Sequence, residues 1–389
     1  MRIAIDGIPL ATPKTGIGHY TFELAAELAR ARPGDEFELI APVAVAAPLA
    51  EACGGRVPAN LRASAPRSDG PLRRRWWSFG LPLALREGGF DLYHGTNYNV
   101  PPWAACPTVV TVHDLSLLLH PATHTPRLVE LARRRLPVMT RTAAHILTDS
   151  ESVRTEIRDR LGVAPEGVTA VPLAPRRAFR AAPPAESAAA RLRLGVDEDF
   201  LLFVGTVEPR KNLLTLVRAF DLLTRETELR PQLVIAGQRG WLSEELDALV
   251  ESSGLKERIL FTGYVTDGDL AALYSSCRVC VYPSLYEGFG LPPLEAMACG
   301  APVLASRIPV IEEVTGSAAR LVEPTDARAM ARALAELLTD EPARVELAGR
   351  GGEQAARFTW ERTARLTFEV YERALADWRA RKDGRAATG

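Results

Sequence analysis

The sequence predicts an α/β protein built from two doubly wound domains. Short apolar or β-branched runs recur along the chain, amphipathic helical patterns lie between many of them, and 389 residues is too long for one ordinary core. Strands that alternate with helices form parallel sheets covered on both faces. Two successive sets of strands therefore indicate two doubly wound domains.

The expected strands can be listed in chain order. In the first half of the chain they are Arg2–Asp6, Glu36–Val43, Phe90–Gly95, Pro107–Asp114, Ala143–Ser150 and Val168–Pro175. In the second half they are Phe200–Thr206, Gln232–Gln238, Arg258–Tyr264, Val279–Ser284, Ala301–Arg307 and Ala319–Pro324. Amphipathic helices are expected at Tyr20–Arg30, Leu213–Thr224, Glu244–Ser252 and, at the end of the chain, Trp360–Arg381.

The boundary between the domains is expected within Ala178–Ser187, which is rich in Ala and Pro and has no periodicity. This gives a first domain over residues 1–180, a second over 190–365 and a C-terminal helical segment over 366–389. In doubly wound folds, ligands bind beyond the carboxyl ends of the strands. Functional residues are therefore expected in the loops that follow strands.

Composition narrows the class of protein. The hydrophobic fraction is 47%, the charged fraction 24% and the net charge −1, as in a soluble globular protein without bulk attraction to nucleic acid. Five scattered Cys make a disulfide framework unexpected and fit a reducing compartment, and Cys277 and Cys280 are expected to be core thiols. The N-terminus lacks signal-peptide features, and no apolar run reaches the roughly 18 residues of a membrane span. A cytoplasmic protein is therefore expected.

The segment Ser284–Gly300, SLYEGFGLPPLEAMACG, places two carboxylates around a Gly- and Pro-rich turn. Glu287 falls in a loop after an expected strand, and Glu295 is expected in the first turn of a helix opened by two Pro. Free N–H groups at a helix N-terminus bind anions, and carboxylates accept hydrogen bonds from hydroxyls. The pattern fits a ligand with a diphosphate and sugar rings. From the residues alone, a solvated Glu287 and a dipole-complementing Glu295 stay open.

A second loop, Gly205–Asn212, follows the expected strand FLLFVGT. Arg210 and Lys211 come just before a helix, where the helix dipole disfavours cations, so their placement needs a reason. A guanidinium fork and an ammonium group at this place predict a phosphate site. A pair of surface charges is the alternative.

Two motifs of the first half are weaker. Gly16 and Gly18 superficially resemble a dinucleotide fingerprint, but the third Gly is absent and the motif starts well after the strand ending at Asp6. A hydride-transfer enzyme is thus disfavoured, although a loop approaching a phosphate is not. His113 and Asp114 end the expected strand PTVVTVHD, which predicts a role in catalysis or binding. A core His satisfied by a neighbouring Asp is the alternative.

Other charged and His-rich segments point to no defined site. His120 and His124 have helical spacing, but Pro121 and Pro126 oppose a regular helix, so no metal site is predicted. Arg and Trp residues in Leu72–Phe79, and the cluster Arg133–Arg135, fit either an anionic bilayer surface or solvated helical faces. Nucleic acid is disfavoured as a partner by the balanced charge.

Together the motifs are similar to a known family. They include TGIGHYTFELAAEL, HGTNYNVPP, TVHDLS, ILTDSESVRTEI, VGTVEPRKNLLTLVRAF, LVIAGQRGW, ILFTGYVTDGDLAALYSSC and YPSLYEGFGLPPLEAMACGAPVLAS. The chain resembles retaining glycosyltransferases of family 4, in particular bacterial mannosyl- and rhamnosyl-type transferases. The resemblance covers most of the chain. It implies the GT-B fold, in which two Rossmann-like domains face a central cleft, the first on the acceptor side and the second holding the donor. It also implies that the C-terminal helix returns toward the N-terminal domain.

The resemblance assigns roles to the candidate residues. Glu287 would hold donor-sugar hydroxyls, Glu295 the nucleotide ribose, and Arg210 and Lys211 the diphosphate. Further implied contacts are the backbone N–H groups around Phe289, Gly290 and Leu291 for sugar and diphosphate, Tyr264 and Val265 for the nucleobase, Gly16 and Gly18 for closure of the first domain, and His113 near sugar and acceptor. Some members carry an Arg where this chain has Thr206.

The implied reaction is transfer of a sugar from a nucleotide-diphosphate donor, with GDP-mannose as the leading expectation, to a hydroxyl of a saccharide, lipid-linked or small-molecule acceptor, with retention. No metal or other cofactor is expected, because Arg, Lys and the helix end would neutralise the leaving phosphate. Peripheral contact with an anionic membrane at its cytoplasmic face stays open. The alternatives are a sugar-nucleotide epimerase, a phosphorylase, or a non-catalytic nucleotide-sugar-binding partner of another transferase.

Overall fold

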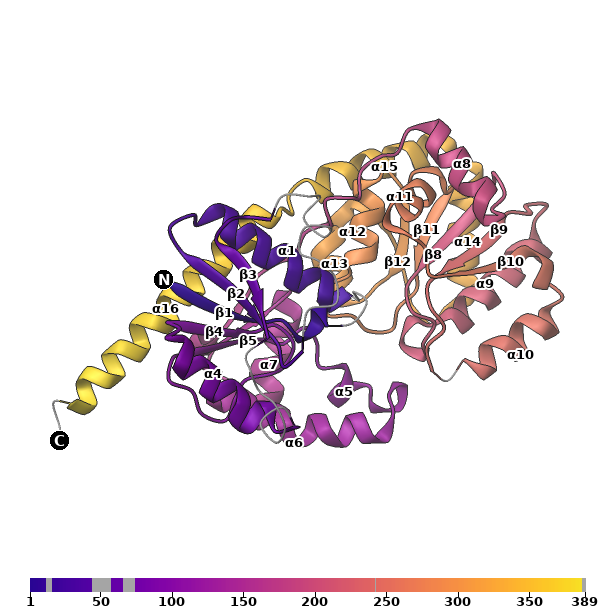
Figure 1. Cartoon of the computed structure of the whole chain (residues 1–389). Coiled ribbons are helices and arrows are strands. Elements are labelled where there is room, and N and C mark those ends of the chain that lie inside the picture. Colours follow the sequence, from indigo (N-terminus) through magenta and orange to yellow (C-terminus); the bar gives the residue numbers. More distant parts are fainter. Residues whose placement is uncertain (12–15, 44–56, 66–73, 242, 387–389) are drawn as a thin grey trace. The chain divides into compact units, whose positions relative to one another are not determined.

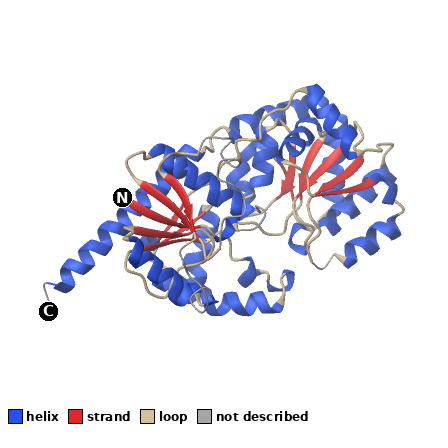
Figure 2. Ribbon diagram, viewed as in Figure 1, coloured by secondary structure: helices blue, strands red, loops and turns tan. Residues whose placement is uncertain are grey.

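The structure is a computed structural model that describes residues 1–11, 16–43, 57–65, 74–241 and 243–386. Contacts within the chain divide it into two compact units. The first unit joins Met1–Leu173 to Thr359–Gly389, and the second runs without interruption from Ala174 to Phe358. Each unit is a parallel sheet between layers of helices (Figure 1; Figure 2). The two doubly wound domains predicted from the sequence are confirmed.

The first unit contains a seven-stranded sheet with the order β3-β2-β1-β4-β5-β6-β7. Its strands are β1 (Arg2–Asp6), β2 (Glu36–Ile40), β3 (Leu61–Ser64), β4 (Leu92–Gly95), β5 (Thr108–Thr111), β6 (His145–Thr148) and β7 (Val168–Ala170). Its helices are α1 (Gly16–Ala31), α4 (Leu81–Gly88), α5 (Ser116–Leu119), α6 (Pro126–Thr142), α7 (Glu151–Leu161) and α16 (Trp360–Ala386). Short helical turns lie at η1 (Ile8–Leu10), η2 (Trp76–Gly80), η3 (Pro121–Thr123) and η4 (Pro165–Gly167).

The second unit contains a six-stranded sheet with the order β10-β9-β8-β11-β12-β13. Its strands are β8 (Phe200–Val204), β9 (Gln232–Ala236), β10 (Ile259–Gly263), β11 (Val279–Tyr282), β12 (Val303–Ser306) and β13 (Arg320–Val322). Its helices are α8 (Pro184–Leu194), α9 (Leu213–Glu226), α10 (Glu244–Ser253), α11 (Asp267–Ser276), α12 (Leu291–Ala298), α13 (Pro309–Thr315), α14 (Ala327–Thr339) and α15 (Glu341–Ala355). Short turns lie at η5 (Pro209–Lys211), η6 (Lys256–Arg258) and η7 (Gly316–Ala318).

Parallel pairing places the carboxyl ends of neighbouring strands at one edge of each sheet. The apolar runs read from the sequence are buried on both faces: β8 and β9 are buried almost throughout, and α9 packs its apolar face on them through Leu216 and Phe220. Buried leucines contribute about 1.5–3 kcal/mol each. The sheets thus form rigid platforms for the loops at their carboxyl edges.

Several expectations about boundaries need correction. The structure divides the chain at 173/174 and 358/359, and residues 184–194, part of which was expected to be a linker, form α8, which Pro184 opens at a helix N-terminus. Residues 360–386 form one helix that belongs to the first unit from its start. Strand β3 was missed because two of its residues are exposed, so it lacks an apolar pattern.

Helix α16 is tied to the first unit by polar and aromatic contacts. The Tyr371 hydroxyl lies 2.6 Å from Nδ1 of His94 on β4, and Thr363 donates to the carbonyl of Pro172 at 2.7 Å. Phe368 packs under the guanidinium of Arg32 at 4.1 Å. These contacts explain why the end of the chain folds with its beginning.

Two further features concern the cysteines and the hydropathy of the helices. Cys106, Cys277, Cys280 and Cys299 are buried free thiols, as expected for core cysteines, while Cys53 lies outside the described residues. Within the described ranges, no helix is both long and apolar enough to cross a membrane.

Candidate active site

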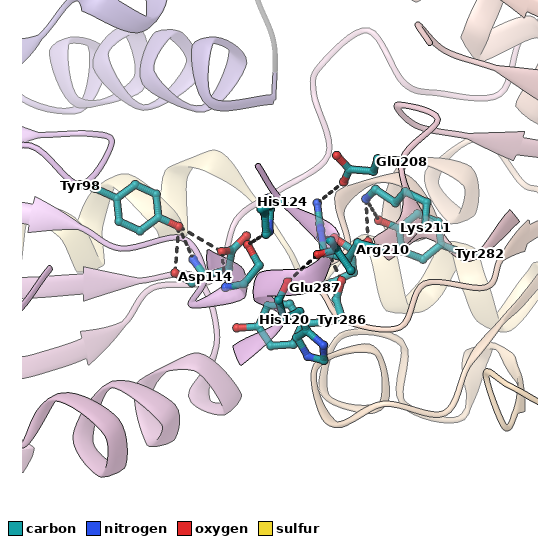
Figure 3. A network of polar contacts seen from close by, with 12 residues as sticks. Tyr98, Asp114, His120, His124, Glu208, Arg210, Lys211, Tyr282, Tyr286 and Glu287 are labelled. Carbon is teal, nitrogen blue, oxygen red and sulfur yellow. Dashed lines mark hydrogen bonds and ion pairs between the residues drawn. The ribbon is translucent and has the colours of Figure 1, made fainter. Parts of the chain in front are cut away.

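The two loops singled out in the second half of the chain meet at the carboxyl edge of the second sheet. Arg210 and Lys211 follow β8, and Glu287 follows β11, which pairs directly with β8. Figure 3 shows the side chains of Arg210 and Lys211 directed at Glu287. Side chains that lie about seventy-five residues apart in the sequence thereby come within hydrogen-bonding distance.

These residues form a charge cluster, defined as Glu208, Arg210, Lys211 and Glu287. Lys211 Nζ donates to Glu287 Oε1 at 2.6 Å, Arg210 Nη1 donates to Oε2 at 2.9 Å, and Arg210 Nη2 donates to Glu208 at 2.7 Å. Burial opposes ionisation of Glu287, but Lys211 and Arg210 outweigh it and lower its pKa to about 2. The cluster therefore holds Arg210 and Lys211 beside two carboxylates, of which Glu287 stays charged at neutral pH. Burial lowers the pKa of Lys211, against the opposing effect of Glu287.

Three features fix the shape of the loop that carries the cations. Asn212 adopts the left-handed conformation at φ 58° and donates to the carbonyls of Pro283 and Pro324 at 2.9 and 2.6 Å. The N–H of Leu285 donates to the carbonyl of Arg210 at 2.9 Å. Asn tolerates this conformation better than most residues, and its amide supplies both donors. Asn212 is a positioning residue that sequence analysis did not single out.

Close approach of two strand ends requires glycine beneath this loop. A Cβ on Gly237 would lie 2.0 Å from the carbonyl oxygen of Gly205, and both residues have positive φ, 149° and 152°. Only glycine adopts this geometry readily. The ends of β8 and β9 can therefore meet directly below the loop of the charge cluster.

Glu295 is also buried, but it does not lie in the first helical turn as expected. Helix α12 begins at Leu291, so Glu295 comes one turn later, and the first turn holds no acidic residue. Its carboxylate accepts from Arg176 Nε at 2.7 Å and from Nη2 at 3.2 Å. The side chain is thus held by a two-point ion pair and is not a simple complement to the helix dipole.

The segment between the two glutamates also differs in accessibility from residue to residue. Gly290 has φ 102°, and a Cβ there would lie 2.7 Å from Ile311 Cδ1, so this position requires glycine. Phe289 is buried against Phe358, with ring centroids 5.8 Å apart, whereas Leu291 is half-buried. The N–H groups of Gly290 and Leu291 therefore lie at the start of α12, as the sequence suggested.

The loop after β10 presents an aromatic surface at the same edge of the sheet. Tyr264 is 69% exposed although it is large and aromatic, and Val265 behind it is buried. An exposed Tyr ring offers a stacking face for a planar base. The nucleobase contact at Tyr264 and Val265, implied by the family resemblance, stays a prediction.

In the first unit, His113 lies in a polar network of its own. Its Nδ1 is 2.7 Å from Asp149 Oδ2, and its Nε2 is 2.8 Å from the carbonyl oxygen of Thr96. A carbonyl only accepts, so Nε2 carries a proton, and the carboxylate favours one on Nδ1. Burial alone would lower the pKa of His113, but Asp149 and the two hydrogen bonds raise it above its ordinary value. Both ring nitrogens of His113 are therefore occupied by oxygen partners within the first unit.

The remaining candidates of the first unit have diverse surroundings. Gly16 and Gly18 lie in the first turn of α1 itself and not in a loop ahead of it, and residues 12–15 lie outside the described part of the chain. Tyr98 donates to the carbonyl of Asp114 at 2.9 Å (Figure 3). His124 lies 3.0 Å from the hydroxyl of Ser116. Among the described residues, no group of three or more His, Cys, Asp or Glu side chains could hold a metal ion.

Comparison with known proteins assigns the family. Residues 14–174 match the model of "Glycosyltransferase Family 4", and residues 185–355 match that of "Glycosyl transferases group 1". The O-antigen chain mannosyltransferase B of Escherichia coli is 34% identical over 387 residues, which cover 96% of this chain and all of that protein. The chain belongs to the family-4-like GT-B glycosyltransferases.

Further relatives agree with this assignment. The serotype-specific mannosyltransferase WbdA of Escherichia coli is 34% identical over 306 residues, covering 75% of this chain and 36% of the larger protein. Among solved structures, the sucrose-phosphate synthase of Thermosynechococcus elongatus superposes with a TM-score of 0.75 at 23% identity, covering 97% of this chain and all of that one. The structural likeness supports the GT-B fold, and the sequence relatives support the glycosyltransferase family.

Sequence reasoning identified the candidates Arg210, Lys211, Glu287 and Glu295 in the second unit. It did not predict the ion pairs that connect charged side chains there. It paired Arg210 with Lys211 and Glu287 with Glu295 by their position in strand-to-helix loops. Arg176, which binds Glu295, was passed over because it lies in a stretch without periodicity, far from any motif.

Proposed function

We propose that this glycosyltransferase moves a sugar from a nucleotide-diphosphate donor to an acceptor hydroxyl, with retention at the anomeric carbon. The observation that supports this most directly is the charge cluster at the carboxyl edge of the second sheet. The buried Lys211 and the half-buried Arg210 can neutralise a diphosphate leaving group, and such preorganised stabilisation is usually the largest catalytic contribution.

The state of the acidic and basic residues favours a route without a covalent intermediate. Both oxygens of Glu287 accept from cations, so this carboxylate is poorly placed to act as a nucleophile. Both nitrogens of His113 are occupied by Asp149 and the carbonyl of Thr96, so its ring is not a free base. We therefore propose that the leaving phosphate accepts the acceptor's proton on the same face of the sugar.

The proposed donor is GDP-mannose, and the proposed acceptor is a saccharide, lipid-linked or small-molecule hydroxyl. The mannosyl part rests on the O-antigen chain mannosyltransferase B, which matches over 96% of this chain and all of that protein. We also propose that no metal is required, because Arg210 and Lys211 supply the positive charge. Nucleic acid is not a proposed partner, since the net charge is −1.

Thermal stability against GDP-, UDP-, dTDP- and ADP-sugars in the presence of EDTA tests the proposal. A ligand at a hundred times its dissociation constant adds about 2.7 kcal/mol to the free energy of unfolding. We expect GDP-mannose to give the largest increase in Tm. No increase with any of the four would contradict a nucleotide-sugar site, and an increase that appears only after metal is restored would contradict metal independence.

Turnover assays with the stabilising donor separate the alternatives. Consumption of donor without any acceptor would indicate an epimerase, and dependence on inorganic phosphate a phosphorylase. Binding without turnover across a panel of acceptors would indicate a non-catalytic partner. Proton NMR of the first-formed product should show the anomeric configuration of the donor, and the inverted configuration would refute retention.

A further inference from the structure

A second network of charged side chains lies in the second unit, outside the charge cluster. We define the Arg176 network as Arg176, Asp267 and Glu295. Besides its two bonds to Glu295, Arg176 donates from Nη1 to Asp267 Oδ1 at 2.7 Å. All three guanidinium nitrogens are therefore engaged by carboxylates of two different helices, α12 and α11.

The guanidinium is also held by its surroundings. It lies over the ring of Phe179 at 4.3 Å from the centroid, and Phe179 packs edge-on against Tyr274 of α11 at 5.7 Å. Nearby, the N–H of Ala182 donates to the hydroxyl of Ser275 at 2.9 Å, which attaches the same segment to α11. An Arg restrained on three sides is preorganised for planar, two-point recognition.

The residues expected to hold the two halves of a nucleoside lie on α12 and in the loop just before α11, the two helices that Arg176 connects. Glu295 on α12 is the expected partner of the ribose. Asp267 begins α11 one residue beyond the loop residues Tyr264 and Val265, the expected partners of the base, with Thr266 as the N-cap between them. Glu295 also accepts from the backbone N–H of Arg176, so one of its about four lone-pair positions remains for a ribose hydroxyl.

We propose that Arg176 is a positioning residue that fixes Glu295 for the ribose hydroxyls of the donor and sets its distance from the base-binding loop. This inference rests on the proposed function, because it requires a nucleotide donor. Without Arg176, the Glu295 carboxylate would be buried without its cation and free to change rotamer. The ribose would then lose an ordered acceptor while the diphosphate contacts at Arg210 and Lys211 remain.

The test is a thermodynamic cycle in which the protein and the ligand are changed separately and together. Dissociation constants are measured by calorimetry for GDP and for 2′,3′-dideoxy-GDP with the wild type and with Arg176→Met. In the wild type, removal of the ribose hydroxyls should weaken binding about tenfold or more, the effect of a charge-assisted hydrogen bond. In Arg176→Met, GDP should bind about tenfold more weakly and the dideoxy penalty should fall below about threefold.

Matched variants control for general damage. Arg193→Met removes another Arg of the same unit, one that pairs with Asp269 on α11 at the surface, and should leave both dissociation constants within about twofold. Glu295→Gln should reduce the dideoxy penalty as Arg176→Met does, and the double variant should add nothing further. If Arg176→Met fails to fold, Arg176→Lys provides the measurement, with an intermediate penalty expected.

The outcomes distinguish the inference from the function on which it rests. A dideoxy penalty in Arg176→Met that equals or exceeds that of the wild type would overturn the role of Arg176 while leaving the nucleotide site intact. A wild type that binds neither GDP nor UDP nor ADP would overturn the proposed function and this inference with it. In turnover assays of Arg176→Met, KM for the donor should be raised and kcat should change less than about threefold.

Discussion

At the scale of single residues, charge pairing decides the chemistry that the candidate site can support. Glu287 keeps its charge because two cations surround it, and those cations are held in place because Glu287 and Glu208 bind them. A diphosphate placed beside this cluster would meet cations that need no rearrangement. Preorganisation of this kind is where enzymes gain most of their electrostatic stabilisation.

Lys211→Met should lower turnover by about a hundredfold or more, because the side chain keeps its length but loses the charge that faces the leaving group. Turnover is measured with the stabilising donor at saturating concentration. The control is Lys256→Met, which removes an exposed ion pair with Glu251 in the same unit and should change turnover less than about twofold. Near-normal turnover in Lys211→Met would remove this residue from the machinery.

His113 predicts a specific pH dependence of stability. Its folded pKa is raised above the unfolded value, so its contribution is fully present below about pH 6.5 and is lost as the pH rises through the folded pKa. The free energy of unfolding of the wild type minus that of His113→Gln should therefore fall as the pH rises from 6 to 9. Urea denaturation at each pH gives this difference.

His145 supplies a control of opposite sign. Burial lowers its pKa to about 4, so it is neutral in the folded protein and costs stability when the unfolded chain is protonated. The difference between wild type and His145→Gln should rise between pH 5 and pH 7 and then stay level. If this difference changed with pH in the same direction for both histidines, the pH dependence would come from other groups.

At the scale of elements, α6 has a surface that its packing in the fold does not explain. One face is buried through Val129, Leu136 and Met139. The other exposes Leu128, Leu131 and Val138 at 47%, 42% and 47%, although apolar side chains on helices usually face a core. Exposed arginines surround this row: Arg127, Arg133, Arg134, Arg135 and Arg141. A basic helix with exposed apolar residues suits an anionic membrane surface.

By contrast, the Arg-Trp segment is less suited to this role than the sequence suggested. Trp76 is buried in the core of the first unit, and only Phe79 among its described aromatic residues is strongly exposed. Residues 72 and 73 lie outside the described part of the chain. The membrane hypothesis therefore moves from this segment to α6.

We predict that the protein co-sediments at low salt with vesicles containing anionic phosphatidylglycerol and that Leu131→Glu together with Arg134→Glu reduces the bound fraction at least threefold. The matched control is Leu192→Glu with Arg193→Glu, on the exposed surface of α8. The far-ultraviolet circular dichroism of all variants is compared first. Equal binding by wild type and the α6 variant would exclude this helix as the contact.

At the scale of the whole molecule, the two units differ in how the chain builds them. All described residues assigned to the nucleotide lie between Ala174 and Phe358, in one uninterrupted segment. The first unit instead needs both ends of the chain, since α16 supplies the partner of His94 and packs Trp360 and Tyr371 into its interior. The GT-B architecture here is thus one continuous and one discontinuous unit.

Expression of residues 174–358 alone should give a cooperatively folding protein that binds GDP within about tenfold of the whole chain. Residues 1–358, which lack α16, should lose cooperative unfolding of the first unit because large buried side chains are removed. Differential scanning calorimetry and calorimetric titration measure both. A fragment 174–358 that is folded but does not bind GDP would show that the first unit supplies essential contacts.

The sequence by itself determined the number and type of the sheets and the loops in which the acids and bases lie. Each expected run contains a strand, because strands buried on both faces appear as continuous apolar segments. The roles of Gly290 and of the pair Pro292-Pro293 at the start of α12 could be predicted from the sequence because their backbone restrictions are local. Strand β3, half exposed at the edge of its sheet, carried no such pattern and was missed.

The tertiary structure decided which charges meet. The pairing of Lys211 with Glu287, the hold of Arg176 on Glu295 and the double engagement of His113 depend on strand order and side-chain direction, neither of which is encoded within a short segment. Removing one partner of an exposed ion pair costs little, whereas removing one partner of a buried pair leaves an uncompensated charge, so the properties of these groups arise only after folding. The sequence thus supplied the chemical groups, and long-range packing determined their charge, partners and direction.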